Sequence, residues 1–345
     1  MNIAIVIKNM HGYAGTENIA SFMSRVMSKH HKVFIISYEG NESDEPFYEY
    51  NYERCYKLSS LYSEGSIKNI IKEENITKVF VISMGKLSVS FFLKNIRLFF
   101  NKRIKIFSCE HVSIKSFNTF KKFIKILTLK FYNKVICLTS TDKVFFDRFL
   151  INSLVIENPI TFKSFDRKSR TKKALAVGRL NNQKGFERLL LIWSNFIKTN
   201  PEWILNIAGD GEELNNLLEY CESYSISDSV NFLGKVDRLD ELYQKSDLFL
   251  MTSHYEGLPM VLLEAKSWSL PCIAFNCPTG PKEIIENNVD GFLIQNGNFN
   301  SYVEAMKLLS SDDELYFDFV RSTKFTHKKF SVDIVKEKWV LLSNE

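Results

Sequence analysis

The sequence predicts an α/β protein with two doubly wound parallel sheets, one in each half of the chain. Its 345 residues are long for one hydrophobic core and suit two domains of about 150 to 180 residues. Short β-branched runs alternate with stretches of helical spacing in both halves. Such alternation is typical of parallel sheets that are covered by helices on both faces.

The strands expected in the first half are Asn2–Lys8, Lys32–Tyr38, Lys78–Ser83, Arg103–Cys109 and Lys134–Thr139. Those expected in the second half are Lys173–Gly178, Trp203–Ala208, Val230–Gly234, Asp247–Thr252, Pro271–Phe275 and Gly291–Ile294. Asn158–Pro159 closes the first series, and a polar, basic connector covers residues 160–173. We therefore predict domains at residues 1–160 and 173–325, and a last amphipathic helix within residues 326–345.

The composition is that of an ordinary soluble globular protein, with 45% hydrophobic and 25% charged residues. The six cysteines include no C-x-x-C pair, so we expect reduced core thiols and no zinc site. Residues 1–9 are too few for a secretory signal, and no apolar run approaches the ~18 residues of a membrane span. We therefore expect a cytoplasmic protein that is neither secreted nor membrane-spanning.

Charge is divided unevenly along the chain. Residues 1–165 carry 24 Lys and Arg against 14 Asp and Glu, whereas the remainder carries 21 against 26. The imbalance is sharpest within residues 86–134, where Glu110 is the one acid among twelve bases. The two halves are therefore expected to face different partners.

The stretch most informative about function covers residues 251–275. A predicted strand ends at Thr252, a loop follows, and a helix is expected over Pro259–Trp268. Pro259 suits the first helical position, because its missing N–H would have no partner there. The first-turn N–H groups lie at the positive end of the helix dipole, so they suit an anion such as a diphosphate.

Two carboxylates bracket the start of this helix. Glu256 precedes the first turn, and Glu264 lies inside the helix, five residues after Pro259. At ~1.5 Å rise per residue, these steps cover roughly 7.5 Å, about the distance from a diphosphate to the ribose of the same nucleotide. Each carboxylate could accept hydrogen bonds from sugar hydroxyls. The alternative is an amphipathic helix with two ordinary surface glutamates.

The run Glu256–Pro259 (EGLP) and the seven residues between Glu256 and Glu264 resemble the E-x7-E signature of glycosyltransferase family 4. Members are retaining enzymes of the GT-B fold, so the resemblance implies two facing Rossmann-like domains with a cleft between them. It also implies that Glu264 binds the ribose and Glu256 the transferred sugar, with Gly257 and Leu258 beside the donor. The C-terminal helix would then cross back to the first domain.

Residues 178–185 (GRLNNQKG) follow the first strand of the second half and contain Arg179 and Lys184. A basic pair in a loop is usually just solvated, but this pattern resembles the diphosphate clamp of the family. Arg offers a planar fork and Lys a point charge to phosphate oxygens. In the first half, Gly12 and Gly15 follow the first strand and would let the backbone approach a diphosphate. A simple turn is the alternative there.

Ser108–His111 (SCEH) follows a predicted strand, and ligands of open α/β sheets bind at the carboxyl ends of strands. His111 is therefore a candidate site residue, although a lone histidine is more often structural. An acid–histidine pair at this point resembles the active-site histidine of family 4, which contacts the transferred sugar. The residues assigned to catalysis are His111, Arg179, Lys184 and Glu256. Those assigned to donor binding are Gly15, Gly257, Leu258 and Glu264.

The resemblance implies a retaining hexosyltransferase that moves a hexose or N-acetylhexosamine from a UDP-sugar to a saccharide acceptor in surface polysaccharide (O-antigen or capsule) biosynthesis. We expect no metal ion and no cofactor beyond the UDP-sugar donor, since Asp44–Glu45 and Asp312–Asp313 lack the context of metal ligands. Two alternatives are a nucleotide-sugar epimerase of similar fold, although the E-x7-E motif argues against it, and a catalytically silent, membrane-associated scaffold.

A helix expected over Phe117–Tyr132 has an apolar face and a basic face. The apolar face contains Phe117, Phe120, Phe123, Ile124, Leu127 and Phe131. The basic face contains Lys121, Lys122 and Lys125. One explanation is a core helix with a solvated basic back. Because the run Phe91–Phe100 is also basic and aromatic, we instead expect docking on an anionic inner leaflet, where each Lys or Arg contributes about 1 kcal/mol.

Such docking predicts a peripheral location on the inner face of the plasma membrane. It also predicts that the acceptor is a lipid-linked saccharide carried on a polyprenyl diphosphate. No nucleic acid is expected as a partner.

Overall fold

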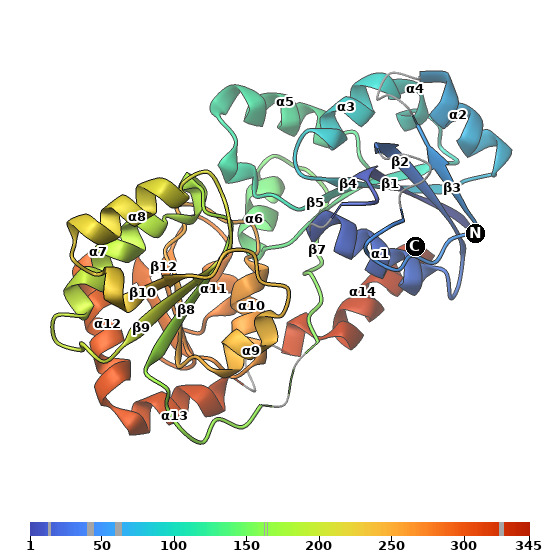
Figure 1. Ribbon diagram of the computed structural model, residues 1–345. Coiled ribbons are helices and arrows are strands. Elements are labelled where there is room, and N and C mark those ends of the chain that lie inside the picture. Colours follow the sequence, from blue (N-terminus) through green and yellow to red (C-terminus); the bar gives the residue numbers. More distant parts are fainter. Residues whose placement is uncertain (13–14, 40–44, 59–63, 162, 164, 324–327) are drawn as a thin grey trace. The chain divides into compact units, whose positions relative to one another are not determined.

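The computed structural model describes residues 1–12, 15–39, 45–58, 64–161, 163, 165–323 and 328–345. The chain forms two compact units. Unit 1 comprises Met1–Asn158 with Asp333–Glu345, and unit 2 comprises Pro159–Val332. Each unit contains a parallel sheet packed with helices (Figure 1), which confirms the predicted α/β class. Within the residues described, no helix combines the length and the hydropathy needed to cross a bilayer.

The described part of unit 1 contains a seven-stranded parallel sheet of order β3-β2-β1-β4-β5-β6-β7. The strands are β1 Asn2–Asn9, β2 Lys32–Glu39, β3 Arg54–Lys57, β4 Lys78–Ser83, β5 Lys105–Glu110, β6 Lys134–Cys137 and β7 Ser153–Val155. Five of them were predicted to within about two residues. The strands β3 and β7 were missed because both are short edge strands with partly exposed side chains, so neither has a continuous apolar run.

Helices cover both faces of this sheet. The helices of unit 1 are α1 Gly15–Met27, α2 Glu64–Glu73, α3 Leu87–Lys94, α4 Ile96–Phe99, α5 Thr119–Leu129, α6 Ser140–Arg148 and α14 Val332–Asn344. Residues of α2 to α5 pack on one face, in a core shared with Val79 and Val81 of β4. On the other face, the Trp339 ring of α14 lies edge-on to Phe80, 6.1 Å between centroids. The C-terminal helix therefore completes the core of unit 1.

Unit 2 contains, in its described part, a six-stranded parallel sheet of order β10-β9-β8-β11-β12-β13, and all six strands were predicted. The strands are β8 Lys173–Val177, β9 Ile204–Ala208, β10 Val230–Phe232, β11 Leu248–Met251, β12 Cys272–Asn276 and β13 Gly291–Gln295. The helices are α7 Phe186–Phe196, α8 Leu214–Ser223, α9 Leu239–Gln244, α10 Met260–Ser267, α11 Pro281–Ile284, α12 Phe299–Ser311 and α13 Asp313–Ser322.

The strand order reverses direction once in each sheet, between β1 and β4 in unit 1 and between β8 and β11 in unit 2. In doubly wound sheets, the loops on either side of such a reversal diverge and leave room for a ligand at the carboxyl ends of the strands. In unit 2 these are the loop that contains Arg179 and Lys184, after β8, and the loop that contains Glu256, after β11. The topology therefore brings the sequence-predicted residues of unit 2 to one edge.

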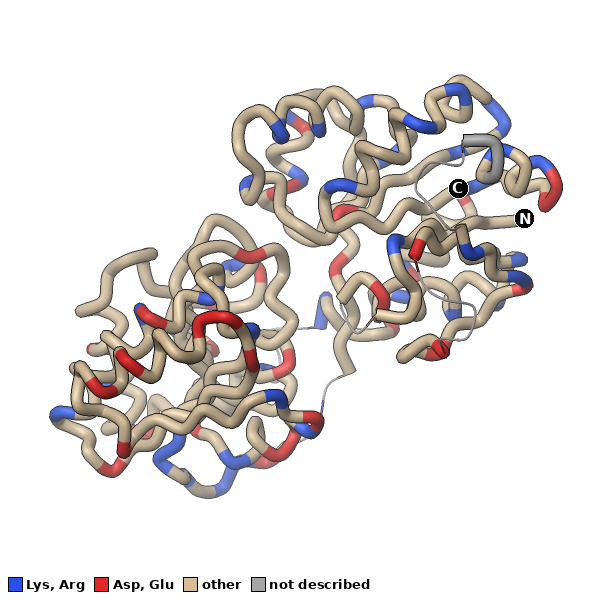
Figure 2. The backbone as a smooth tube through the Cα atoms, turned by 45° about the horizontal axis from the view of Figure 1, so that its top comes forward, with Lys and Arg blue, Asp and Glu red and all other residues tan. Residues whose placement is uncertain are grey.

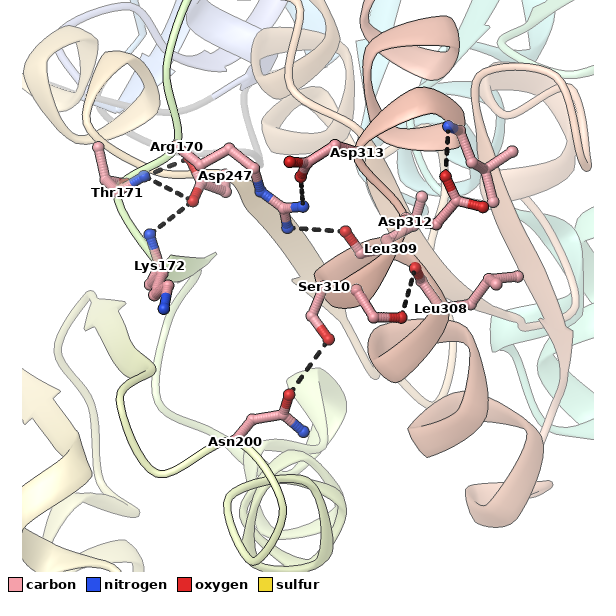
Figure 3. A network of polar contacts seen from close by, with 12 residues as sticks. Arg170, Thr171, Lys172, Asn200, Asp247, Leu308, Leu309, Ser310, Asp312 and Asp313 are labelled. Atoms are coloured by element: carbon pink, nitrogen blue, oxygen red, sulfur yellow. Dashed lines mark hydrogen bonds and ion pairs between the residues drawn. The ribbon is translucent and has the colours of Figure 1, made fainter.

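The segment predicted as a polar connector is in fact part of unit 2. The backbone N–H groups of Thr171 and Lys172 donate to Asp247 Oδ2 over 2.7 and 2.6 Å, and Arg170 pairs with Asp313 over 2.7 Å (Figure 3). Arg167 is buried. Charged side chains gave this segment a solvated pattern in the sequence, but they bind carbonyls and carboxylates of the unit. The expected boundary near residue 325 falls in residues 324–327, outside those described.

Helix α5 lies within the predicted segment 117–132, but its aromatic side chains face outward, whereas Lys125, Thr128 and Leu129 face the core. The outward side chains Phe120, Phe123, Leu127 and Phe131 are 73%, 60%, 47% and 48% exposed. Lys125, which was predicted on a solvated basic face, is instead buried and pairs with Glu110. The prediction for Lys125 was wrong because a buried carboxylate holds its amine on the inner side, so the aromatic stripe on the opposite side faces outward.

Candidate active site

Two predicted residues meet at the strand-order reversal of unit 2. Lys184 Nζ lies 2.8 Å from Glu256 Oε1, and the pair is largely withdrawn from solvent. Ser253 Oγ donates to the same carboxylate oxygen over 2.7 Å, and Thr279 Oγ1 donates to the backbone carbonyl of Glu256. These contacts fix the Glu256 carboxylate in one orientation. Because an ammonium has three donors, Lys184 can hold Glu256 and still donate to a ligand oxygen.

A glycine allows the loop after β8 to close on the end of β11. Gly185 has φ +63°, and a Cβ on it would lie 2.5 Å from the carbonyl oxygen of Thr252. Thr252 Oγ1 in turn donates to the carbonyl of Gly185 over 2.8 Å. Between them, Asn181 Oδ1 accepts from the backbone N–H of Lys184 and starts a single 3-10 turn over Asn182–Lys184. The spacing of the GRLNNQKG motif therefore places the Lys184 side chain at the sheet edge.

Arg179 lies in the same loop but is largely exposed. Its Nε lies 3.7 Å from Glu212 Oε2, in the loop after β9, and no contact with Glu256 accompanies this among the described residues. An exposed ion pair of this kind contributes only about 0 to 1 kcal/mol, so it constrains the guanidinium little. Arg179 therefore stands at the predicted edge with a side chain that can move to a ligand.

Helix α10 begins one residue later than predicted. Pro259 is its N-cap, with φ −72° and ψ 102°, and not its first helical residue. The proline ring fixes φ but leaves ψ extended, so the helical conformation starts at Met260. Pro259 makes no side-chain hydrogen bond, so the N-cap residue offers no acceptor to the first-turn N–H groups of α10. Leu258 is buried, and a Cβ on Gly280 would lie 2.5 Å from the Gly257 carbonyl, so this loop packs tightly on its neighbour.

Glu264 is held by a tyrosine that sequence analysis did not identify. Tyr243 of α9 donates its hydroxyl to Glu264 Oε2 over 2.9 Å. Burial raises the pKa of Glu264, and the hydrogen bond from Tyr243 acts in the opposite direction by favouring the carboxylate. The side chain is thus oriented from α9 before any ligand arrives. No motif surrounds Tyr243 in the sequence, so nothing there pointed to this role.

Arg167 holds the C-terminal ends of α9 and α10 together. Its guanidinium donates to the backbone carbonyls of Tyr243, Gln244, Ser246, Trp268 and Ser269. Burial lowers its pKa, but the carbonyl oxygens at two helix ends provide the negative potential that a cation needs. Since Glu264 lies on α10 and its partner Tyr243 on α9, Arg167 fixes both elements that orient the carboxylate.

A buried ion pair fixes α10 on its other side. Lys266 Nζ pairs with Asp290 and donates to the carbonyl of Ile284 over 2.7 Å. Both charged side chains are fully buried, and desolvation lowers the pKa of Lys266. Together with Arg167, this pair attaches α10 to the rest of unit 2 through polar contacts at two places. The helix that contains Glu264 is therefore rigidly placed.

In unit 1, His111 lies directly after β5, at the carboxyl edge of the sheet, as predicted. Its backbone N–H donates to the carbonyl of Ser83 over 3.0 Å. Within the described structure, neither ring nitrogen has a hydrogen-bond partner, and burial lowers the pKa of His111 to about 4. The imidazole is therefore neutral at pH 7, and its two nitrogens are buried without a partner among the described residues.

Glu110 and His111, the acid and the histidine of SCEH, make no side-chain hydrogen bond to each other among the described residues. Glu110 ends β5 and pairs with Lys125, 2.6 Å away, because successive side chains of a strand point to opposite faces. Gly15, also of unit 1, is the first residue of α1, and a Cβ there would meet no atom within 4 Å. That position is therefore open, while the preceding residues 13–14 lie outside those described.

The Asp312–Asp313 cluster, which was not expected to bind a metal, has structural partners. Asp312 caps α13 by accepting from the N–H of Leu315, and Asp313 pairs with Arg170 (Figure 3). Asp44 lies outside the described residues. Across the part of the chain that the structure covers, no group of three or more His, Cys, Asp or Glu side chains is arranged to hold a metal ion.

Residues 157–324 match the family model for glycosyl transferases group 1. The chain is 32% identical over 355 residues to the amylovoran biosynthesis glycosyltransferase AmsD of Erwinia amylovora, covering 98% of both chains. It is 25% identical over 367 residues to a Campylobacter jejuni enzyme, covering 100% of this chain and 99% of the other. That enzyme is named GalNAc-alpha-(1->4)-GalNAc-alpha-(1->3)-diNAcBac-PP-undecaprenol alpha-1,4-N-acetyl-D-galactosaminyltransferase.

Among solved structures, Anabaena HepE in complex with UDP and glucose aligns with a TM-score of 0.82 over 100% of both chains at 15% identity. That likeness shows a shared GT-B fold. The identity to AmsD extends over nearly the whole of both chains, and the matched model covers the unit that contains Lys184, Glu256 and Glu264. The chain therefore belongs to the glycosyl transferases group 1 family and is a glycosyltransferase.

Proposed function

We propose that the protein is a retaining glycosyltransferase of family 4 that moves a hexose or N-acetylhexosamine from a UDP-sugar to a polyprenyl-diphosphate-linked saccharide in surface polysaccharide biosynthesis. The observation that carries the proposal is the Lys184–Glu256 pair beside the N-terminus of α10. The names of the relatives support the setting. AmsD is named for amylovoran biosynthesis, the Campylobacter jejuni enzyme for an undecaprenol-diphosphate-linked saccharide, and HepE was solved with UDP and glucose.

The donor diphosphate lies where positive groups converge on one edge of unit 2. Lys184 supplies an ammonium that Glu256 already orients, and Arg179 supplies a guanidinium that is free to turn. The first-turn N–H groups of α10 add the positive end of the helix dipole. Preorganised donors of this type each contribute about 10²–10³ in rate when they meet charge that develops in the transition state. They stabilise the leaving diphosphate without a metal ion.

The two carboxylates of the motif then bind different sugars. Glu264 follows Met260, the first residue of α10, by four residues, and at ~1.5 Å rise per residue this places it roughly 6 Å along the axis from the diphosphate. It accepts from the ribose diol with the oxygen that Tyr243 leaves available. Glu256 accepts from a hydroxyl of the transferred sugar, next to Gly257 and Leu258.

His111 contacts the transferred sugar as a neutral imidazole, and Gly15 borders the donor. In the transfer step, the bond between the anomeric carbon and the diphosphate oxygen breaks and a bond to the acceptor hydroxyl oxygen forms on the same face. The hydroxyl proton passes to the departing diphosphate oxygen. This route needs no protein nucleophile.

The acceptor is lipid-linked, and the first unit rests on an anionic membrane surface. The segment of residues 86–134 carries twelve bases and one acid, and Lys and Arg are frequent along unit 1 (Figure 2). The one acid, Glu110, lies buried against Lys125. The exposed side of α5 is aromatic, and basic residues flank it. Apolar side chains beside positive charges suit the interface of an anionic leaflet. This surface would bring the enzyme to polyprenyl-linked saccharides.

The test is a transfer assay with a panel of UDP-sugars and polyprenyl-diphosphate-linked saccharides. The wild-type protein should form a new glycosidic product with at least one pair, and Glu256→Gln should lower its yield by about two orders of magnitude. Glu219→Gln, a change of an exposed glutamate on α8, should behave as wild type and serves as the matched control. Epimerised donor without transfer would favour the epimerase. Binding of UDP without any turnover would favour the silent scaffold.

A further inference from the structure

The lysine on the inner side of α5 is part of a buried polar cluster. Lys125 Nζ lies 2.6 Å from a carboxylate oxygen of Glu110, and both side chains are almost completely buried. The same amine donates to the carbonyl of Gly85 over 2.8 Å and contacts Ser88 Oγ at 3.2 Å. Ser108 Oγ donates to the other oxygen of Glu110 over 2.7 Å. The cluster therefore satisfies the charges of both members of the ion pair.

Two of these partners, Glu110 and Gly85, lie at the edge of the sheet that contains His111. Glu110 is the last residue of β5, and His111 follows it. Gly85 comes two residues after the end of β4, the strand to which the His111 backbone is hydrogen-bonded through Ser83. Lys125 therefore contacts residues at the carboxyl ends of both β4 and β5. The backbone of His111 is held at the same two strand ends.

A second contact attaches Phe117, two residues before α5 begins, to the same edge. Gly85 has φ +111°, and a Cβ on it would lie 2.3 Å from the ring of Phe117, so the ring occupies the space of a side chain. The Lys125 ammonium lies 5.2 Å from the centroid of that ring. Two residues at the ends of the segment 117–125 therefore contact one glycine. Helix α5 therefore has little freedom to move unless this edge of the sheet moves with it.

An ion pair at this position is not needed for stability alone. Replacing a buried ion pair with apolar groups of similar size is often neutral or stabilising, whereas removing one partner costs about 3–5 kcal/mol. The inner side of an amphipathic helix would ordinarily carry leucine or isoleucine there. The Lys125–Glu110 ion pair also fixes the distance and the relative orientation of α5 and the end of β5.

We propose that Lys125 is a positioning residue that joins α5 and the His111 edge into one rigid element, so that membrane docking through the aromatic face of α5 sets the place of His111 relative to the lipid-linked acceptor. The inference rests on the proposed function for the membrane-bound acceptor and for the role of His111. It adds the connection between the two, which runs from the exposed Phe120 and Phe123 through Lys125 and Glu110 to His111.

The test uses the full-length protein and the uncharged double variant Lys125→Met/Glu110→Gln, which leaves no unpaired buried charge. The variant should bind UDP and float with anionic vesicles as the wild type does. Its kcat with vesicle-held acceptor should fall at least about tenfold, since a displacement of about 1 Å can cost 10²-fold. In histidine-labelled protein, the NMR titration of His111 should move toward the ordinary pKa. The matched control is Lys143→Met/Asp147→Asn, an exposed ion pair on α6, which should change neither value.

Two further variants distinguish a loss of membrane docking from a loss of the connection between Lys125 and His111. Phe120→Ser/Phe123→Ser should lose vesicle binding but keep the His111 titration and the transfer to a short-chain, water-soluble acceptor. Ser88→Ala, which removes one contact of Lys125 without changing charge, should shift the His111 titration in the same direction as the double variant, even if the latter folds poorly. A wild type that neither floats nor transfers sugar would contradict the proposed function. A wild type that does both, beside Lys125 and Ser88 variants with unchanged kcat and His111 titration, would overturn the inference.

Discussion

Lys184 Nζ and Glu256 Oε1 lie 2.8 Å apart although 72 positions of sequence separate the two residues. The strand order explains the contact, because β8 and β11 are neighbours in the sheet and each residue lies in the loop after its strand. Sequence motifs suggested a phosphate role for one residue and a sugar role for the other. The ion pair adds that each residue orients the other before the donor binds.

Lys184→Met should lower turnover by about two orders of magnitude, as expected for a lost donor to a charged leaving group. It should also loosen Glu256, which loses its ion-pair partner. Lys198→Met, at an exposed lysine two residues after the end of α7, is the control of equal size and charge change. Steady-state kinetics with the preferred UDP-sugar provide the measurement, and near-normal turnover in Lys184→Met would remove this residue from the site.

Tyr243→Phe should weaken UDP binding about tenfold, because a hydrogen bond to a charged group contributes about 1.5–3 kcal/mol and here orients Glu264. At saturating donor, kcat should change little. Glu264→Gln should weaken UDP binding as well, whereas Glu256→Gln should spare UDP affinity and reduce transfer. Calorimetry with UDP measures all three, with Tyr220→Phe, at an exposed tyrosine of α8, as control. The assignment of the two carboxylates would be refuted by the opposite pattern.

His111 makes the stability of the protein depend on pH. Burial holds its folded-state pKa at about 4, below the unfolded value of 6.5, so folding favours the neutral ring. The contribution is fully present above pH 6.5 and is lost as pH falls from 6.5 toward 4, by on the order of 3 kcal/mol. Urea unfolding of wild type and His111→Gln at pH 7.5 and pH 5 isolates this contribution. The variant should lose less stability on acidification, and equal losses would show that His111 titrates normally.

The parts of the fold and of the site that could be predicted are those that depend on short, contiguous stretches of sequence. Eleven strands lie in segments rich in apolar residues, so their positions followed from sequence, while the short edge strands β3 and β7 have partly exposed side chains. Lys184, Glu256 and Glu264 were located by their motifs. The residues that position Glu264 were not, because Tyr243, which donates to Glu264, and Arg167, which donates to the carbonyl of Tyr243, come from distant parts of the chain.

The orientation of α5 likewise could not be predicted from the spacing of its aromatic and basic residues. Spacing identified an aromatic stripe and a basic stripe on opposite sides of the helix. It could not tell that Lys125 faces the core while Lys121 stays exposed, because the inward position of Lys125 depends on the buried carboxylate of Glu110 on β5. The inward lysine is therefore a tertiary effect that overrides the usual rule that apolar faces are buried.

Transfer should persist in excess EDTA. In the proposed mechanism, Arg179, Lys184 and the N-terminus of α10 meet the charge of the leaving diphosphate, which is the role that Mg²⁺ or Mn²⁺ would otherwise play. Activity should be the same before and after treatment with the chelator, and added metal should not increase it. Complete loss with EDTA that is reversed by metal would place an ion at the diphosphate.

The central claim is the retaining transfer of sugar from a UDP-sugar to a lipid-linked acceptor, and the most direct measurement is proton NMR of the purified product. With an α-configured UDP-sugar and a polyprenyl-diphosphate-linked saccharide, the anomeric proton of the newly added sugar should show the α configuration. A β-linked product would contradict retention. The absence of any new glycosidic bond across the donor and acceptor panels would contradict the account of the site itself.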